Sequence, residues 1–166
     1  MNFLKNFQDF KNYLYKKENI FYLIVVLTIF FLDRFSKIIV LNNFRDNTHY
    51  INNFINLDLI WNIGIGFGLL STYTSIIYSL ITTIIALVII FLLYIFVISE
   101  SLDKFIYAII LGGALGNFYD RLVYKAVPDF IDLHYNNFHW FTFNVADIFI
   151  TLGIVTFVLR GFFIKN

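Results

Sequence analysis

The chain has 166 residues, of which 60% are hydrophobic and 14% are charged, whereas soluble domains average about 45–50% and about 25%. Its mean hydropathy of +0.77 excludes a soluble globular domain, because too little polar surface remains to cover the apolar mass. Disorder is excluded as well, since it requires low hydrophobicity and high charge. The net charge of +1 offers no basic face for nucleic acid, and the absence of cysteine excludes disulfides, thiolate metal sites and a cysteine nucleophile. An integral membrane protein remains.

The first nineteen residues differ from the rest of the chain. They carry four lysines, and their apolar side chains recur at a four-three-four spacing, which is one face of a helix. This pattern is typical of an amphipathic helix on the membrane surface, or equally of a basic tail that flanks the first span. We therefore divide the chain into an N-terminal segment, 1–19, and one membrane domain, 20–166.

Four apolar stretches predict four transmembrane helices, because a helical crossing needs about 20 residues. The expected spans are 21–41, 73–98, 105–123 and 144–164. The segments 42–72, 99–104 and 124–143 are expected to be loops. The predicted fold is an all-α membrane protein with four transmembrane helices. A small extracytoplasmic loop region at the membrane surface, chiefly 42–72, can contain short β-strands.

The distribution of basic residues predicts the orientation of these spans. Lysine and arginine gather in the N-terminal segment, the short loop 99–104 and the C-terminal end, whereas the two long loops hold only Arg45 and Lys125. The positive-inside rule then places both termini in the cytoplasm and the long loops outside.

Polar residues inside the spans converge on one end of the predicted bundle. They are Asp33 and Lys37 in the first span, Asn117, Asp120 and Arg121 in the third, and Asn144 and Asp147 in the fourth. Ionisable groups there cost about 2.5–3.5 kcal/mol each on insertion scales, so a function or a pairing must account for them. With the predicted orientation, all of them lie at the outer face of the membrane, on the same side as Asp129.

A purely structural explanation covers part of this cluster. Asp33 can pair with Lys37, and Asp120 with Arg121, so that these charges only hold helices together. That pairing leaves Asp129 and Asp147 without a cation. Two such carboxylates can share a proton, so that one draws a proton from water while the other protonates a substrate.

Alternatives to this paired-acid chemistry stay open at the level of spacing. Asp147 can be a helix N-cap, Asp129 can be a solvated loop carboxylate, and Asp132 competes for the loop role. His134 and His139 can bind metal, but their spacing matches no helix face and no third ligand is evident, so we expect no metal and no cofactor.

A non-enzymatic membrane protein, such as a small transporter or an assembly subunit, is the competing functional class, because it also needs intramembrane charges. Two features argue against it: the polar cluster lies at one end rather than at the midplane, and the two halves of the chain show no repeat.

Five motifs in chain order resemble the lipoprotein signal peptidase (signal peptidase II) family of bacteria. They are Asp33–Lys37 (D-x-x-S/T-K), Asn62–Phe67 (N-x-G-x-small-F), Gly112–Arg121 (G-G-A-x-G-N-x-x-D-R), Val127–Phe130 (close to V-V-D-F) and Phe143–Asp147 (F-N-x-A-D). Together they cover roughly residues 20 to 160. Two positions depart from the family pattern: Pro128 stands where valine is usual, and Trp61 stands where a basic residue is frequent.

The resemblance implies an aspartic endopeptidase of the bacterial cytoplasmic membrane. It would remove signal peptides from prolipoproteins, cutting before the cysteine that carries diacylglycerol. By motif, Asp129 and Asp147 correspond to the catalytic dyad. Positions that line the peptide site correspond to Asn62, Gly64, Asn117, Arg121 and Asn144, and structural polar positions to Asp33, Lys37 and Asp120. The implied partners are prolipoprotein signal peptides with a lipid-modified cysteine and membrane lipid, with no nucleic acid and no obligate protein partner.

Overall fold

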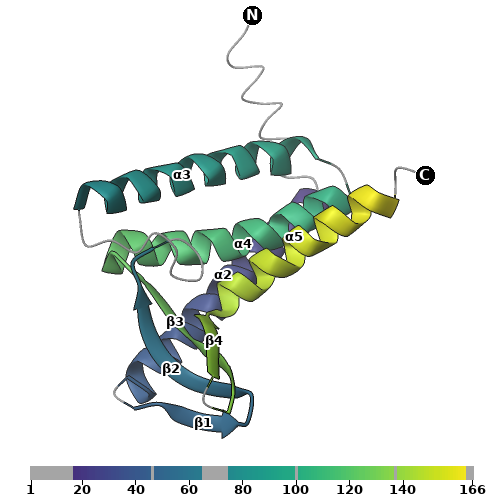
Figure 1. The fold of residues 1–166 in the computed structure, drawn as a ribbon. Coiled ribbons are helices and arrows are strands. Elements are labelled where there is room, and N and C mark those ends of the chain that lie inside the picture. The colour runs from purple at the N-terminus through teal and green to yellow at the C-terminus, as the bar shows by residue number, and fades with distance from the viewer. Residues whose placement is uncertain (1–16, 46, 65–74, 100, 137, 164–166) are drawn as a thin grey trace, which may run out of the picture.

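The computed structural model describes residues 17–45, 47–64, 75–99, 101–136 and 138–163, and Figure 1 shows their arrangement. The helices in this part of the chain are α2 (Lys17–Asn43), α3 (Ser75–Ile98), α4 (Ser101–Tyr124) and α5 (Val145–Phe163). Most of the predicted N-terminal amphipathic segment, residues 1–16, lies outside the described residues, as does 65–74 in the glycine-rich stretch.

Each predicted span overlaps one of these helices. One boundary was wrong: α4 begins at Ser101, so most of the predicted loop 99–104 is helical. Asp103 lies in the first turn of α4, where its negative charge favours a helix start because it faces the positive end of the helix dipole.

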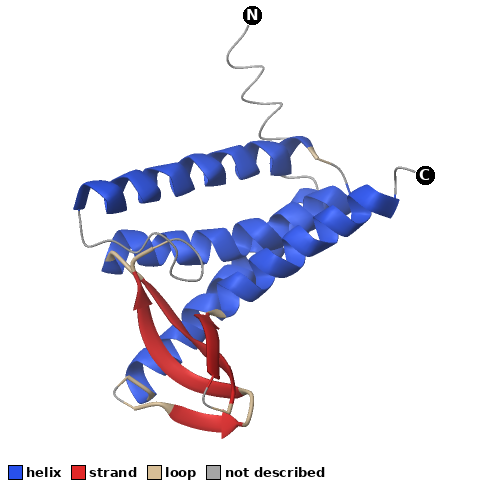
Figure 2. Cartoon of the chain, in the orientation of Figure 1, coloured by secondary structure: helices blue, strands red, loops and turns tan. Residues whose placement is uncertain are grey.

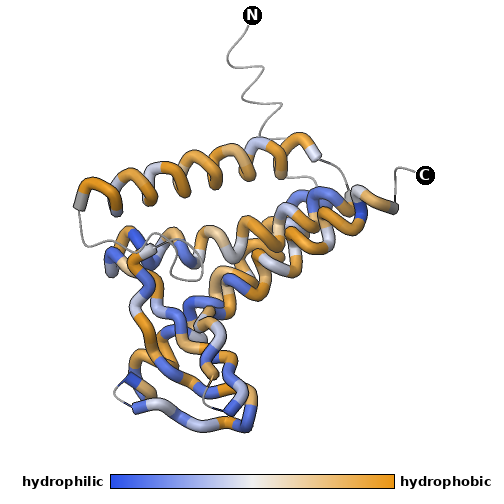
Figure 3. Tube along the Cα trace, in the orientation of Figure 1, coloured by the Kyte–Doolittle hydropathy of each residue, from blue (hydrophilic) through white to orange (hydrophobic). Residues whose placement is uncertain are grey.

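Two of the described helices are long and apolar enough to cross a membrane by length and composition, α3 over Ile76–Ile98 and α5 over Val145–Phe162. The other two, α2 and α4, carry ionisable residues within their apolar sequence. Figure 3 shows the outcome along the Cα trace, with α3 almost wholly hydrophobic and polar positions concentrated near the helix ends and in the sheet.

Helix α4 holds the bundle together, since it contacts α2, α3 and α5. Its glycines allow close approach: a Cβ on Gly112 would lie 2.8 Å from the Cβ of Ile29, and one on Gly113 would lie 2.6 Å from the carbonyl oxygen of Ala146. Small residues are common where membrane helices pack closely. The bundle core includes Val26, Ile89, Ala108 and Leu111.

An antiparallel sheet lies at one end of the helices, coloured red in Figure 2. Its strands are β1 (His49–Asn52), β2 (Ile55–Asn62), β3 (Val127–Tyr135) and β4 (Phe138–Phe143), paired in that order. Strands in the first loop confirm the expectation for 42–72. The mostly helical fold with a β-containing loop region agrees with the expectation, but 124–143 was expected to be a plain loop and contains a hairpin.

The sheet brings the first and second loop regions together. Strands β2 and β3 pair so that Ile60 is opposite Asp129 and Asn62 is opposite Val127. The strand β4 then leads directly into α5. As a result, the end of β2, the start of β3 and the start of α5 all meet beside the C-terminal end of α4.

Candidate active site

A cavity of about 450 Å³ opens where the sheet meets the helices. Its polar wall consists of Asn62, Asn117, Arg121, Asp129, Asn144 and Asp147. Its apolar wall comes chiefly from Ile84, Ile85, Val88 and Ile89 of α3 and from Ile150, Thr151 and Ile154 of α5. The structure therefore brings all but one of the predicted dyad and peptide-site residues to a single cavity wall. The exception, Gly64, is held nearby by hydrogen bonds to Asn62 and Arg121.

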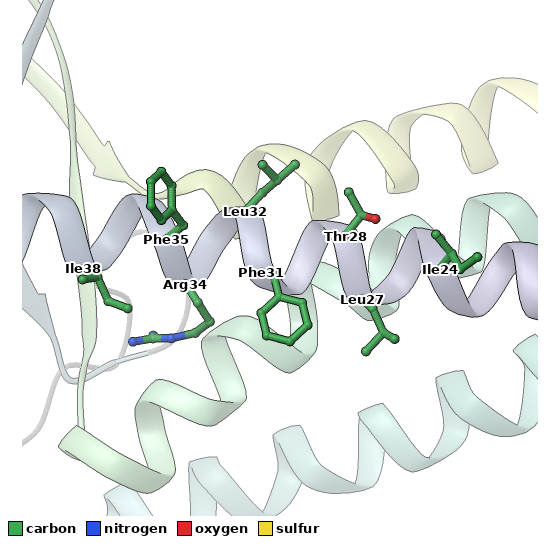
Figure 4. A pocket seen from close by; sticks show the side chains of 8 residues that line it. All are labelled: Ile24, Leu27, Thr28, Phe31, Leu32, Arg34, Phe35 and Ile38. Carbon is green, nitrogen blue, oxygen red and sulfur yellow. The ribbon is translucent and has the colours of Figure 1, made fainter.

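A second hollow, of about 660 Å³, follows one side of α2 and is drawn in Figure 4. Its described lining is apolar apart from Thr28 and Arg34. The Arg34 guanidinium forms an ion pair with Asp120, and no carboxylate lines the hollow. Of these two cavities, the first is the one lined by the paired carboxylates.

Asp129 lies near the start of β3 and is buried, with an exposed fraction of only 3%. The Asn62 side-chain amide donates to Oδ2 of this carboxylate at 2.9 Å, and the Asn144 amide donates to Oδ1 at 2.6 Å. Both oxygens thus accept a hydrogen bond from a neutral amide. The solvated-loop alternative for Asp129 is wrong, because the side chain is buried on a strand and bonded to Asn62 and Asn144.

Asp147 lies in the first turn of α5. Asn144 precedes the helix, and its Oδ1 accepts from the Asp147 backbone N–H at 3.1 Å, while Asp147 Oδ2 accepts from the Asn144 N–H at 3.2 Å. This reciprocal pair is a capping box. The N-cap is therefore Asn144, and Asp147 is the acid three residues on. Its other oxygen, Oδ1, accepts from the side chain of Asn117 at 2.8 Å.

The side-chain oxygen of each of the three asparagines accepts a hydrogen bond, and this bond fixes the orientation of the amide. That donor is the Gly64 N–H at 2.9 Å for Asn62, the Lys37 ammonium at 2.8 Å for Asn117 and the Asp147 N–H at 3.1 Å for Asn144. An amide has one acceptor end and one donor end. Because the acceptor end is occupied, the donor end of each asparagine must face a carboxylate.

The pKa of the Asp129 carboxyl depends on its burial and on these neighbouring groups. Burial raises the pKa of the Asp129 carboxyl to about 6, and the negative charge of Asp147 adds to the rise, while the amide hydrogen bonds from Asn62 and Asn144 oppose it. A carboxyl group with this pKa can hold a proton or release it near neutral pH, which is the property that acid–base catalysis requires.

The remaining charged residues form a separate cluster behind this wall. The Lys37 ammonium lies 2.8 Å from Asp33 Oδ2 and 2.7 Å from Asp120 Oδ2, and Arg34 pairs with the other oxygen of Asp120. The predicted Asp33–Lys37 pair is confirmed. The predicted Asp120–Arg121 pair was wrong, because neighbouring residues on a helix point in different directions. Sequence analysis also missed the role of Arg34.

Arg121 points toward the cavity and not toward Asp120. Its Nη2 donates to the Gly64 carbonyl oxygen at 2.6 Å, and its buried Nε has no hydrogen-bond partner among the described residues. The Tyr78 hydroxyl of α3 donates to the Arg121 carbonyl oxygen at 2.8 Å, which connects the N-terminal end of α3 to the C-terminal end of α4. No motif pointed to Tyr78 or to the apolar wall of α3.

Asp132, the competitor for the loop role, lies elsewhere. Its carboxylate is 2.7 Å from His139 Nδ1 and 3.8 Å from His134 Nδ1, and none of the three lines the cavity. The two histidines are register partners across the β3–β4 hairpin. Within the described part of the chain, no three acidic or imidazole side chains are arranged to hold a metal ion.

Comparisons with known proteins agree with this geometry. The family model for signal peptidase (SPase) II matches residues 25–163. The chain is 48% identical over 147 residues to the lipoprotein signal peptidase of Pelagibacter ubique, covering 87% of this chain and 89% of that one. This chain belongs to the signal peptidase II family.

Other signal peptidase II relatives and two solved structures extend the comparison. Identity is 44% to the lipoprotein signal peptidase of Francisella tularensis subsp. novicida, covering 70% of this chain and 74% of the relative, and 35% to that of Anaplasma marginale, covering 86% and 84%. Two bacterial membrane enzymes of known structure share the fold, each at 24% identity. Their TM-scores are 0.75, covering 87% of this chain and 89% of that one, and 0.67, covering 84% and 90%.

The signal peptidase II match includes every residue of the cavity wall and of the charged cluster, since all of them lie within 25–163. The two departures from the family pattern, Trp61 and Pro128, are register partners in the sheet. Proline has no N–H to donate, and Pro128 directly precedes Asp129. The departures therefore form one local change in the sheet, next to the cavity.

Proposed function

We propose that the chain is a membrane-embedded aspartic endopeptidase that removes signal peptides from bacterial prolipoproteins, cutting before the diacylglyceryl-modified cysteine. The observation that carries the proposal is one cavity with two enclosed carboxylates, Asp129 and Asp147, whose oxygens accept hydrogen bonds from amides and not from cations. Membership in a peptidase family supports the reaction class.

The proposed reaction needs one proton shared between the two acids. One carboxylate takes a proton from water while the water oxygen attacks the scissile carbonyl carbon, and the protonated carboxyl gives its proton to the carbonyl oxygen. The tetrahedral diol then collapses: a hydroxyl proton returns to the second acid, the C–N bond breaks and the first acid protonates the amine. No covalent intermediate forms, and both acids regain their starting states.

The cavity walls suit a substrate that arrives in the membrane. The aliphatic side chains of α3 and α5 that line it can contact the apolar signal helix and the acyl chains of the modified cysteine. On the polar side, Asn62, Gly64, Asn117, Arg121 and Asn144 are proposed to bind the peptide near the scissile bond. The buried Arg121 Nε, which has no partner among the described residues, is available to donate to a substrate carbonyl.

The proposal includes four membrane crossings, α2 to α5, with both termini in the cytoplasm and the sheet outside. The charges of α2 and α4 near the sheet are compatible with crossing, because Asp33, Lys37 and Asp120 are fully buried inside the bundle. The lipid-facing positions of these helices, such as Phe31 and Leu122, are apolar and exposed, as expected for a surface covered by lipid.

Cysteine labelling tests this topology, and the chain has no native cysteine to interfere. Tyr50 in β1 and Asn136 in the β3–β4 turn are exposed. Single cysteines at these positions should react with an impermeant reagent in intact cells. Reaction only after the membrane is opened would contradict the proposed orientation.

Cleavage of a purified prolipoprotein tests the function itself. The diacylglyceryl-modified precursor, mixed with the purified protein in detergent, should lose its signal peptide, as measured by mass spectrometry. The same precursor without the lipid should be cut far less. An uncut precursor in the presence of folded protein would favour the transporter or assembly-subunit alternative, which needs the same intramembrane charges but no turnover.

A further inference from the structure

The two carboxylates of the cavity are not held in the same way, and the difference concerns Lys37. We propose that Lys37 is a positioning residue for catalysis, which acts through the Asn117 amide to keep Asp147 as the ionised carboxylate and thereby leaves the shared proton on Asp129. This inference rests on the proposed function and adds the division of labour between the two acids.

The first observation is a continuous hydrogen-bonded chain from a buried cation to Asp147. Lys37 Nζ donates to Asn117 Oδ1 at 2.8 Å, and Asn117 Nδ2 donates to Asp147 Oδ1 at 2.8 Å. The ammonium fixes which end of the amide faces the acid, because a cation cannot face an N–H donor. Hydrogen-bonded chains of this kind polarise one another, so the ammonium strengthens the Asn117 N–H donor that faces Asp147.

The second observation is the location of Asp147 at the start of a helix. It is the capping-box acid of α5, and its Oδ2 accepts the Asn144 backbone N–H at 3.2 Å. Negative charge is stabilised there because the N-terminal end of a helix carries a partial positive charge. Geometry from two directions, the amide chain and the helix end, therefore favours ionised Asp147.

Asp129 lacks both features. It lies on a strand, and its two oxygens accept from the neutral amides of Asn62 and Asn144. Strands carry only small net dipoles. Burial and the negative charge of Asp147 raise the pKa of Asp129 to about 6, in keeping with a carboxyl that holds the proton when its partner is ionised.

Other charged groups near the dyad do not supply this asymmetry. Asp33 and Asp120 both contact Lys37, and Arg34 pairs with Asp120, so the cluster as a whole is neutral. Arg121 lines the cavity with its guanidinium bonded to Gly64 and Asn117 carbonyl oxygens. From α3, the Tyr78 hydroxyl is engaged with the Arg121 carbonyl oxygen.

In the resulting step, the Asp147 carboxylate takes the proton from water as the water oxygen bonds to the scissile carbon. Asp129 gives its proton to the carbonyl oxygen. On collapse of the diol, Asp129 takes back a hydroxyl proton, the C–N bond breaks and the Asp147 proton goes to the leaving nitrogen. The atoms balance, and each acid ends in the state in which it began.

The pH dependence of kcat tests the inference, because a merely structural residue lowers kcat without moving the limbs of the profile. The variant Lys37→Met with Asp33→Asn removes one charge of each sign and leaves the Arg34–Asp120 pair in place. The pH below which kcat falls should rise by about one unit. At lower pH, kcat should then be about tenfold below that of the wild type, and it should recover as the pH rises. Lys37→Arg should restore the limb toward its wild-type position.

A second variant interrupts the hydrogen-bonded chain from Lys37 to Asp147 without changing the charged cluster. Asn117→Ala interrupts the amide chain while Lys37 keeps its contacts with Asp33 and Asp120, so its acid limb should move in the same direction. As a matched control, Arg160→Met with Asp103→Asn removes the ion pair between α5 and α4 away from the cavity, and the profile should keep its position. A uniform loss of kcat at every pH in both relay variants, or no change, would overturn the inference. Absence of cleavage by the wild-type protein would instead overturn the proposed function.

Discussion

Two groups of buried aspartates lie side by side where the sheet meets the helices, and their hydrogen-bond partners differ. Asp33 and Asp120 are held by the cations Lys37 and Arg34. Asp129 and Asp147 are held by asparagine amides and a backbone N–H. The first group is an ion-pair network, whereas the second is the pair to which the proposed function assigns proton exchange.

Under the proposed function, buried aspartates in one bundle have two roles, structural pairing and proton transfer, and their hydrogen-bond partners distinguish the two. Asp33 and Asp120 each have a countercharge at hydrogen-bond distance, the Lys37 ammonium. A carboxylate against amides gains hydrogen bonds but no countercharge, so burial and its neighbour still favour proton uptake. Asn117 is the contact between the groups, since its oxygen accepts from Lys37 and its nitrogen donates to Asp147.

The largest expected effect separates the groups by function. Asp129→Asn and Asp147→Asn should each abolish prolipoprotein cleavage, because asparagine can neither take the proton from water nor return it. Single-turnover assays should show a loss of at least about 10³-fold, and the double variant should be scarcely worse because the two acids act as one unit. Both variants should remain in the membrane.

The matched control for this prediction is Asp132→Asn. Asp132 is on the same strand as Asp129 and equally buried, with an exposed fraction of 3%, but it contacts His139 and not the cavity. It should keep cleavage activity. Retained cleavage in either dyad variant would show that the catalytic assignment is wrong. Loss of cleavage in a folded Asp132 variant would show the same.

The second effect separates the groups by stability. Asp33→Asn leaves Lys37 with only one carboxylate and weakens the acceptor for the Ala146 backbone N–H, now at 3.0 Å from Asp33 Oδ1. Breaking a buried ion pair costs about 3–5 kcal/mol. The yield of folded protein and the thermal unfolding temperature should therefore fall more than the specific activity of the folded fraction.

The opposite result for Asp33→Asn would show that the two groups of aspartates do not differ in role. If Asp33→Asn gave well-folded protein at normal yield without turnover, Asp33 would belong with the catalytic acids, and the cation-held cluster could no longer be described as structural.

The third effect tests whether close packing of α4 against α5 is needed to hold the two groups of aspartates in position. Gly113→Ala should lower stability by about 1–3 kcal/mol, as overpacking does, because the new Cβ would meet the Ala146 carbonyl oxygen at 2.6 Å. The displaced N-terminus of α5 carries Asn144 and Asp147, so kcat should fall as well.

Gly161→Ala is the matched control on α5, since nothing lies within 4 Å of its Cβ position among the described residues. It should be neutral or raise stability by about 0.5–1 kcal/mol, the usual gain from replacing a helical glycine. Equal effects of the two substitutions on thermal unfolding would show that contact between α4 and α5 does not set the geometry of the site.

Much of this arrangement could be predicted from sequence. Apolar length indicated the helices, and the one-sided placement of polar residues predicted that they would meet. The Asp129–Asp147 pair was inferred because neither has a local cation, and the family resemblance pointed to the same residues. These inferences use properties that are local in sequence, which explains why they carried over to the structure.

Contacts between distant residues could not be predicted. The Arg34–Asp120 pair joins residues 86 apart, and no local pattern announces it. The expected Asp120–Arg121 pair ignored the rotation between adjacent helical residues. The hairpin was missed because the spacing of His134 and His139 was compared only with a helix, although it fits partners across a strand turn.

The fourth expected effect concerns pH and stability, and it follows from the hydrogen-bond partners of Asp129. The pKa of Asp129 is about 6 in the folded protein, against 3.8 as its ordinary value. The folded state therefore holds this proton more tightly than the unfolded state. Between about pH 4 and pH 6 the unfolded chain has released the proton and the folded chain has not, so the free energy of unfolding falls as the pH rises. A difference of about two pH units corresponds to at most about 3 kcal/mol.

Thermal unfolding in detergent from pH 4 to pH 7 measures this decline. The wild type should show it, and Asp129→Asn should show a shallower one because it lacks the titrating group. Since the asparagine in this variant also changes two hydrogen bonds at every pH, the slope carries the test and the absolute stability does not. Asp33→Asn, in the cation-held group, should keep the contribution of Asp129 and hence its share of the slope. An unchanged slope in Asp129→Asn would mean that the folded chain does not hold a proton on Asp129 more tightly than the unfolded chain does.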